Sequence, residues 1–353
     1  MEKAMEEAGA SRRTILKGGA LVAGASLLSS ISGSQFAEAA VTPKALSDFS
    51  ALKGKKIGMF VVDISTPVST RAAAQGKVLA KKYGFSLEVF NAAGDFNKVN
   101  STLATWATKK LDGVIDVGVD PTPIKNGISK LTDANIPIGG IYAGYSSGAG
   151  LMWDVTTNEW INYAKVGTYL LDRLGATGGG SVAIINWPQV PVLRIRSAVV
   201  NQMLDFYNIE ILADEVLAVP GQVVDAKQKV GALLTKYPAG GKLKAIVAGW
   251  DEVGQAASQA IKEAGRTDVF VVSSDGNLEA LEMIRNGDPF AATCGNDIQG
   301  MTTTCFGQLS AVIGGAKPMA TSLYVDAPLV TKENLPAKGK YAIGNGLTPF
   351  YVK

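Results

Sequence analysis

Histidine is absent from all 353 residues of the chain. A Ser-His-Asp triad, a Cys-His nucleophilic pair and a histidine-ligated zinc site all need an imidazole, so the sequence excludes them. Cysteines and carboxylates at metal-ligand spacing are also missing, as are a Walker A loop and a strand-linked G-x-G-x-x-G motif. We therefore expect no metal, no cofactor and no enzymatic activity.

Charge and cysteine are scarce as well. The chain has 34 basic and 31 acidic residues, a formal net charge of +3, without a dense Lys/Arg tract, so nucleic acid is not an expected partner. Its two cysteines, Cys294 and Cys305, could form a disulfide or lie as two separate buried thiols. The export route discussed next carries proteins folded in a reducing cytoplasm, which disfavours the disulfide.

The first forty residues have the pattern of an export signal. Arg12 and Arg13 precede a short apolar stretch, residues 20–31, that is too short to span a bilayer comfortably, and "AEAA" at 37–40 is a small-residue cleavage site. The segment "SRRTILK" resembles the bacterial twin-arginine signal. An ordinary secretory signal with a chance Arg-Arg, or a retained anchor, is the alternative. We expect a signal peptide over residues 1–39 and a periplasmic mature protein.

Beyond the signal, apolar runs alternate with amphipathic stretches of ten to fifteen residues. The first pair is a strand at 55–63 and a helix at 70–84, and the last strand is "FAATCGND" at 290–297. Strands alternating with helices of this length predict βαβ units and parallel sheets. The alternation runs in two series, so we expect an α/β protein with two doubly wound, Rossmann-like lobes and a ligand crevice at their strand ends.

Asp275 stands where one of the last strands should end, in "VFVVSSDGNLEALEMIRNGDPFAATCGND" at 269–297. Carboxyl-terminal strand edges in such sheets face the ligand, so Asp275 is a candidate ligand-binding residue. The alternative is that it caps a helix beginning near Asn277. Asp251 and Glu252 open another helix, and we interpret them as cap and dipole partners. Trp187 and Trp250 fall near strand ends, where rings could stack on a sugar or belong to the core.

The segment around Asp275 resembles the strand-Asp-Gly-helix-"I-x-x-G-x-x-x-A-T" signature of the ribose-type (type 1) periplasmic binding proteins, the solute receptors of bacterial ABC importers. The stretch 240–272, with its helix opened by Asp251-Glu252, and "ANIPIGGIYA" at 134–143 are similar to further motifs of that family. The resemblance implies that Asp275 accepts hydrogen bonds from sugar hydroxyls. It places Arg196, with Arg194 as the neighbouring possibility, at the family's hydroxyl-binding arginine. It also assigns side-chain amides of the site to Asn296 and Asn158.

The chain departs from the ribose receptors at several of their binding positions. Tyr142-Ala143 replaces their first-lobe Asp-Arg pair, Trp250 replaces an asparagine, and Val68 and Ser69 replace stacking aromatics. A pentose other than ribose, a hexose or a sugar alcohol is therefore expected. The candidate ligand-binding residues are Asp275, Arg196, Asn296, Trp250, Tyr142, Asn158, Ser69, Thr66 and Trp187.

The resemblance also implies how the lobes are built and what the protein does. Three crossings near Thr156, Asn296 and Tyr324 would join an N-terminal lobe, residues 40–155 plus 297–323, to a C-terminal lobe and tail, residues 156–296 plus 324–353. A monomer of this kind closes on a sugar or polyol and delivers it to an ABC transporter membrane permease.

A ligand-presenting sensor for a chemoreceptor or sensor kinase is the alternative within binding proteins and is equally compatible with the sequence. A secreted α/β enzyme is the alternative outside them and fits the sequence less well. A regulator of the lactose-repressor type would need an N-terminal helix-turn-helix where this chain has an export signal.

Overall fold

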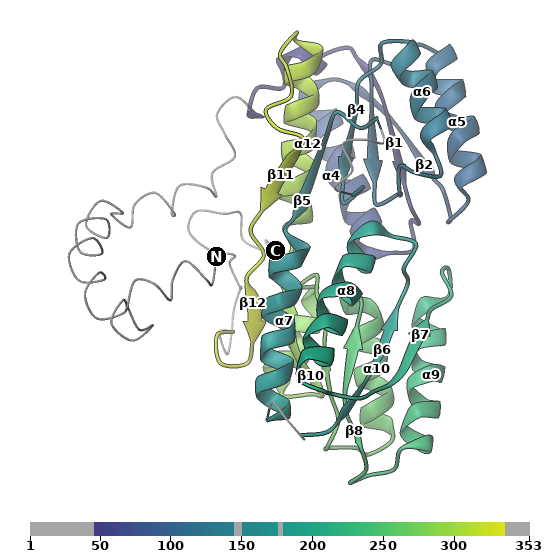
Figure 1. The fold of residues 1–353 in the computed structure, drawn as a ribbon. Coiled ribbons are helices and arrows are strands. Elements are labelled where there is room, and N and C mark those ends of the chain that lie inside the picture. Colours follow the sequence, from purple (N-terminus) through teal and green to yellow (C-terminus); the bar gives the residue numbers. More distant parts are fainter. Residues whose placement is uncertain (1–45, 145–149, 176–178, 336–353) are drawn as a thin grey trace, which may run out of the picture. The chain divides into compact units, whose positions relative to one another are not determined.

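Two six-stranded sheets organise the chain (Figure 1). The computed structural model describes residues 46–144, 150–175 and 179–335. The predicted export signal, residues 1–39, and residues 336–353 of the predicted C-terminal tail lie outside the described residues. Both sheets belong to one compact unit.

The first sheet has the strand order β11-β5-β4-β3-β1-β2, with all neighbours parallel. We call this sheet and its helices the first lobe. Its strands are β1 (Lys56–Val61), β2 (Ser86–Asn91), β3 (Gly113–Val117), β4 (Ile138–Ile141), β5 (Trp153–Thr157) and β11 (Ser322–Val325). The helices are α4 (Pro67–Tyr83), α5 (Phe96–Thr108), α6 (Lys125–Asp133) and α12 (Ile298–Ile313), with a short 3₁₀ helix η2 (Ser50–Leu52).

The second sheet repeats this order as β12-β10-β9-β8-β6-β7, with β12 antiparallel to β10. We call it and its helices the second lobe. Its strands are β6 (Ser181–Asn186), β7 (Ile211–Val216), β8 (Leu243–Ala248), β9 (Phe270–Val272), β10 (Phe290–Cys294) and β12 (Leu329–Thr331). Its helices are α7 (Glu159–Leu174), α8 (Pro191–Phe206), α9 (Gln222–Lys236), α10 (Asp251–Glu263) and α11 (Leu278–Asn286). The prediction of two doubly wound α/β lobes is confirmed.

The burial of each strand follows its place in the sheet. The central strands β3, β6 and β10 are buried along their whole length, as expected where helices cover both faces. The edge strands β2 and β7 contain only exposed and partly buried residues. Trp153 packs so closely on Gly139 of the neighbouring strand that a Cβ there would lie 2.1 Å from the indole. This tryptophan therefore belongs to the core.

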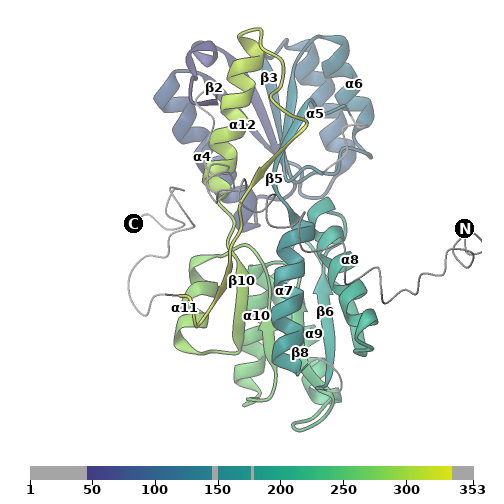
Figure 2. The ribbon, with the colours of Figure 1, turned by 60° about the vertical axis from the view of Figure 1, so that its left-hand side comes forward.

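The chain passes between the lobes three times (Figure 2). It leaves the first sheet after β5, returns to the first lobe between β10 and α12, and crosses again between β11 and β12. Thr156, Asn296 and Tyr324, where the sequence analysis places the crossings, lie within or beside these segments.

Besides the short η2, four of these elements have no counterpart in the sequence prediction, namely β5, β11, β12 and α12. The three strands are only three to five residues long. Helix α12 is buried on most of its surface, so its sequence lacks the polar stripe that marks an amphipathic helix. Even so, none of the helices within the described ranges is both long and apolar enough to cross a membrane.

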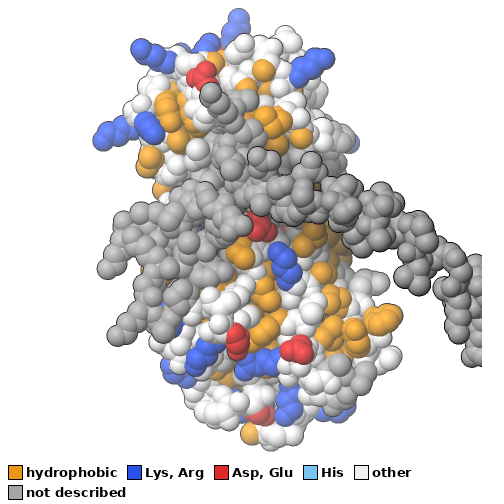
Figure 3. Space-filling model, turned by 90° about the vertical axis from the view of Figure 1, so that its left-hand side faces the viewer, with side chains coloured by type: hydrophobic (Ala, Val, Ile, Leu, Met, Phe, Trp, Pro, Cys, Tyr) orange, Lys and Arg blue, Asp and Glu red, His pale blue; other side chains and the backbone are white. Residues whose placement is uncertain are grey.

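On the face that Figure 3 presents, Lys and Arg prevail in the upper part, and both signs of charge lie side by side in the lower part among neutral and hydrophobic residues. This mixture agrees with the small net charge of the sequence.

Candidate functional site

A cavity lies where the strand order of each sheet reverses direction. In the first sheet β1 lies between β2 and β3, and in the second sheet β6 lies between β7 and β8. The strand order therefore reverses direction at β1 and at β6, and ligands bind at such switch points. The cavity holds about 540 Å³ of space between atoms, part of it open to solvent. From the first lobe it is lined by Val62, Thr66, Pro67, Val68, Val117 and Tyr142, among others. The second lobe contributes, among others, Trp187, Val190, Leu193, Arg196, Trp250 and Asp275.

Asp275 follows β9 in a backbone conformation that residues with a side chain rarely adopt, with φ +145°. Two backbone hydrogen bonds fix it to the neighbouring chain, one from its N–H to Cys294 and one from Asn296 N–H to its carbonyl. Strained residues that the surroundings hold in place cluster at functional sites. The backbone thus orients the Asp275 carboxylate before any ligand arrives.

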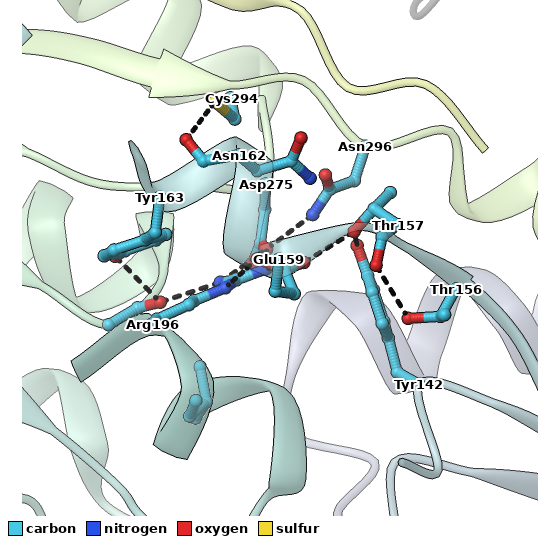
Figure 4. A network of polar contacts seen from close by, with 12 residues as sticks. Tyr142, Thr156, Thr157, Glu159, Asn162, Tyr163, Arg196, Asp275, Cys294 and Asn296 are labelled. Atoms are coloured by element: carbon cyan, nitrogen blue, oxygen red, sulfur yellow. Dashed lines mark hydrogen bonds and ion pairs between the residues drawn. The ribbon is translucent and has the colours of Figure 1, made fainter. Parts of the chain in front are cut away.

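Arg196, on the first half of α8, is the centre of a buried charge network (Figure 4). Its Nε and one terminal nitrogen donate to the two oxygens of Glu159 at 2.8 and 3.0 Å. Both terminal nitrogens donate to Asp275 Oδ1 at 3.2 Å, and one also donates to the Gly249 carbonyl at 2.7 Å. These five hydrogen bonds match the five N–H groups of a guanidinium.

Glu159 is the first residue of α7 and is completely buried. Besides Arg196 it accepts a hydrogen bond of 2.5 Å from Thr157, which in turn shares a hydrogen bond of 3.0 Å with the Tyr142 hydroxyl. Thr157 ends β5 in the first sheet, so this chain of contacts runs from the first-lobe residue Tyr142 through a crossing segment to Arg196 (Figure 4).

Asp275 uses a single oxygen for its side-chain contacts. Oδ1 accepts from Arg196 and also from Asn296 Nδ2 at 3.0 Å. Among the described residues, no hydrogen bond ends on Oδ2. The carboxylate therefore keeps one oxygen available on the cavity wall.

Burial shifts the acid–base properties of this network. It raises the pKa of Asp275 to about 6, against the lowering effect of Arg196, and Glu159 adds a further increase. Burial also raises the pKa of Asp251 to about 7, with the nearby charge of Asp275 acting in the same direction. For Arg196, burial favours a lower pKa, but Glu159 and Asp275 outweigh it and hold the guanidinium charged.

The interpretation of Asp251 as a helix cap is wrong. Its carboxylate is buried and accepts from Asn277 N–H at 2.7 Å and from the Thr293 hydroxyl at 2.7 Å. It therefore ties the turn after Asp275 to β10 instead of capping α10. The capping alternative for Asp275 is also contradicted, because no side-chain hydrogen bond caps α11 and the Asp275 carboxylate contacts Arg196 and Asn296.

The structure brings most of the predicted site residues to one cavity. Those that line it are Asp275, Arg196, Trp250, Tyr142, Trp187, Thr66 and Ser69. Asn296 is fully buried behind Asp275 and contacts its carboxylate. Asn158 is not among the lining residues, and its side-chain oxygen accepts from Ile161 N–H as the N-cap of α7. Arg194, the alternative to Arg196, instead forms an ion pair with Asp120.

Sequence reasoning did not identify Glu159, Thr157 or Tyr163. Tyr163 donates to the Ala248 carbonyl at 2.6 Å, and its ring lies 5.6 Å from the Arg196 guanidinium carbon. An acidic residue in the first turn of a helix is a common surface pattern, so nothing local distinguishes Glu159. Only its tertiary position against α8 shows its role.

The two cysteines are separate buried thiols. Cys294 ends β10, while Cys305 lies on α12 beside Trp153. Burial raises the pKa of Cys294 to about 12, so this thiol is protonated at neutral pH. The described residues also contain no group of three or more His, Cys, Asp or Glu placed to hold a metal ion.

Comparison with known proteins gives this geometry a context. Residues 57–317 match the model of the periplasmic binding protein domain. The chain is 26% identical over 286 residues to a xylitol-binding protein of Mycolicibacterium smegmatis, covering 80% of this chain and 78% of that protein.

Solved structures share the fold, among them the following two. An ABC sugar transporter subunit from Rhodobacter sphaeroides has a TM-score of 0.74 and 24% identity, with 80% of this chain and all of that chain covered (100%). An ABC transporter solute-binding protein from Agrobacterium vitis with bound allitol has a TM-score of 0.73 and 24% identity, covering 80% of this chain and 97% of the other. Because the family model spans most of the sequence, the chain belongs to the periplasmic binding proteins, which are extracytoplasmic solute-binding proteins and not enzymes.

Proposed function

We propose that this protein captures a sugar or sugar alcohol in the cavity between its lobes and delivers it to the membrane permease of an ABC transporter. The observation that carries the proposal is the available oxygen of Asp275, which stands on the cavity wall while Arg196 and Asn296 hold the other oxygen. The xylitol-binding relative supports a polyhydroxylated ligand.

The chemistry of the site suits a neutral ligand. A charged acceptor held in position makes stronger hydrogen bonds to hydroxyls than a neutral one does. Arg196 already donates to protein groups with every N–H, so its positive charge serves to orient Asp275 and not to bind an anion. A phosphorylated or carboxylated ligand would meet the negative charge of Asp275 instead of a free cation.

Aromatic rings supply the apolar contacts that the C–H faces of a sugar need. Trp187, Trp250 and Tyr142 line the cavity and are almost completely buried. The indole N–H of Trp250 lies 3.4 Å from Glu252, which also accepts from Gln222 at 2.9 Å. This contact orients the Trp250 ring on the cavity wall.

Hydrogen bonds between the lobes support a hinge mechanism. Arg71 of α4 donates to Asn277 at 3.0 Å, and Arg194 of α8 pairs with Asp120 after β3. A ligand that contacts both lobes would stabilise this closed arrangement over an open one. We propose lobe boundaries moved by two residues from those expected from the sequence, to the ends of β5 and β11, so that residues 46–157 plus 297–325 form the first lobe and 158–296 plus 326–335 the second.

We also propose a route of export for this protein. The paired Arg12-Arg13 and weak apolar stretch support a twin-arginine signal that is removed near residue 39, and the two-lobed domain then acts as a periplasmic monomer.

A ligand screen tests the function. The purified protein is heated with each member of a sugar and polyol library, and compounds that raise its melting temperature are titrated by calorimetry. We expect at least one neutral sugar or polyol to bind, whereas the corresponding sugar phosphates do not. A library without a single ligand, or tighter binding of the phosphates, would contradict the proposal.

A further inference from the structure

The cavity has few polar groups left to bind hydroxyls. The five N–H groups of Arg196 already have acceptors. The Thr66 hydroxyl donates to the Asp63 carbonyl at 2.9 Å and lies 3.0 Å from the Ser69 hydroxyl. The Tyr142 hydroxyl is engaged with Thr157. Among the described side chains of the wall, Asp275 Oδ2 is therefore the acceptor with the clearest spare capacity.

Most of the wall is instead hydrocarbon. Where β1 and β3 end in the first lobe, Val62 and Val117 line the cavity, together with Pro67 and Val68 at the start of α4. On the second lobe Val190 and Leu193 continue this apolar surface beside the rings of Trp187 and Trp250. We call Val62, Pro67, Val68 and Val117 of the first lobe the apolar end of the cavity, and Asp275 and Arg196 of the second lobe its polar end.

A fully hydroxylated polyol fits this wall poorly. Each hydroxyl pressed against the valines would give up its water without gaining a partner, and burying a polar group unpaired is costly. A methyl or other apolar group at the same place would gain from burial. Such a wall therefore favours the ligand with the apolar group by a moderate factor, on the order of 10 to 100.

We infer that the ligand is a sugar or polyol with an apolar substituent at one end, such as a deoxy sugar or an alkyl-substituted pentose. This inference rests on the proposed function and narrows it. The hydroxylated part of the ligand contacts Asp275, and the apolar substituent packs on Val62, Pro67, Val68 and Val117.

Matched pairs of sugars test the inference by calorimetric titration. The pairs are D-ribose with 5-deoxy-D-ribose, D-xylose with methyl β-D-xylopyranoside, and galactose with its 6-deoxy derivative. In at least one pair we expect the substituted member to bind about tenfold or more tightly than the parent, which corresponds to about 1.4 kcal/mol.

A pair of variants tests whether the preference for a substituted sugar depends on the apolar wall of the cavity. Val68→Asn places an amide on the apolar end of the cavity. It should therefore lower the affinity for the substituted sugar and raise the affinity for the unsubstituted sugar. Val78→Asn, on the same helix but 57% exposed and absent from the lining residues, is the matched control and should change neither. If the Val68→Asn variant still prefers the substituted sugar as strongly as the unmutated protein does, the assignment of the apolar end is overturned.

The possible failures are distinguishable. If unsubstituted sugars or plain polyols bind at least as tightly as all the substituted sugars, this inference is overturned and the proposed function still holds. Absence of binding by all members of the pairs and by the wider polyol library would overturn both.

Discussion

Arg196 directs two hydrogen bonds of 3.2 Å to the same oxygen of Asp275, Oδ1. A bidentate pair would have used one nitrogen for each oxygen. Arg196 makes that bidentate contact with Glu159 instead, at 2.8 and 3.0 Å. The guanidinium is thus anchored by one carboxylate and orients a second, whose other oxygen remains available on the cavity wall.

Glu159→Ala should destabilise the ligand-free protein. It leaves two nitrogens of Arg196 and the Thr157 hydroxyl without the carboxylate that accepts from them. Breaking a buried ion pair by removing one partner costs roughly 3 kcal/mol or more. Urea denaturation measures this loss in the free energy of unfolding.

Glu279→Ala is the matched control, since Glu279 also lies in the first turn of a helix but is exposed. Its removal should cost no more than about 1 kcal/mol, the scale of a helix-dipole contact. Equal losses in the two variants would show that Glu159 acts only as a helix-terminus charge.

The stability of the ligand-free protein should depend on Asp251 through pH. Burial raises its pKa to about 7 in the folded protein, above the usual value of 3.8, so the folded state binds the proton more tightly than the unfolded state. This contribution is fully present below about pH 4 and is lost as pH rises through about 7.

Asp251→Asn removes the titrating group and can still accept from Asn277 N–H. The melting temperature of this variant, relative to the parent, should therefore increase between about pH 4 and about pH 7. A difference that stays constant, or that falls over this range, would show that Asp251 is not protonated in the folded state. Differential scanning calorimetry at a series of pH values makes the comparison.

The ion pair between Arg194 and Asp120 should contribute only modestly to closure. It joins the lobes, but the Arg194 side chain is 46% exposed, and exposed pairs contribute about 0–1 kcal/mol. Arg194→Gln should weaken ligand binding by no more than about fivefold, and the difference should shrink at high salt. Lys242→Gln, which removes an ion pair with Glu210 inside the second lobe, should leave binding unchanged.

Ligand should also shrink the particle, since closure brings the lobes together. Small-angle scattering of the parent protein with and without a saturating ligand measures the radius of gyration. An identical radius in both states would contradict hinge closure while leaving binding itself intact.

Replacing Arg12 and Arg13 with lysine should keep the precursor in the cytoplasm if export uses the twin-arginine route. Cell fractionation and blotting give the distribution of precursor and mature protein. Normal delivery of the mature form in the double variant would indicate the general secretory route instead.

The sequence was sufficient to predict the doubly wound lobes because their helices are amphipathic and their strands are bounded by turns. Helix α7, for example, ends at Leu174 and is followed by Gly175 in the left-handed conformation that glycine favours after a helix. Short β5 and the mostly buried α12 carry no such pattern, so packing rather than local sequence determines them.

The part of the candidate site that lies at strand ends was predictable from the sequence, and the part that depends on helix packing was not. Asp275 and the tryptophans stand at strand ends, a position that local sequence reveals. The role of Glu159 depends on the packing of α7 against α8, which brings Glu159 to Arg196. These two residues are 37 positions apart in the sequence, so no local pattern reveals their contact. Asn158 shows the opposite case, because a residue typical of N-caps was predicted to bind ligand and caps α7 in the structure.

Calorimetric titration of Asp275→Ala with a ligand that the parent protein binds tests the account most directly. Loss of a hydrogen bond to a charged group costs roughly 1.5–3 kcal/mol, so affinity should fall at least about tenfold. Asp275→Asn should bind better than the alanine variant, because its amide oxygen can still accept, and thermal melts should show both variants folded. Parent-like affinity in a folded Asp275→Ala variant would contradict the assignment of this cavity as the ligand site.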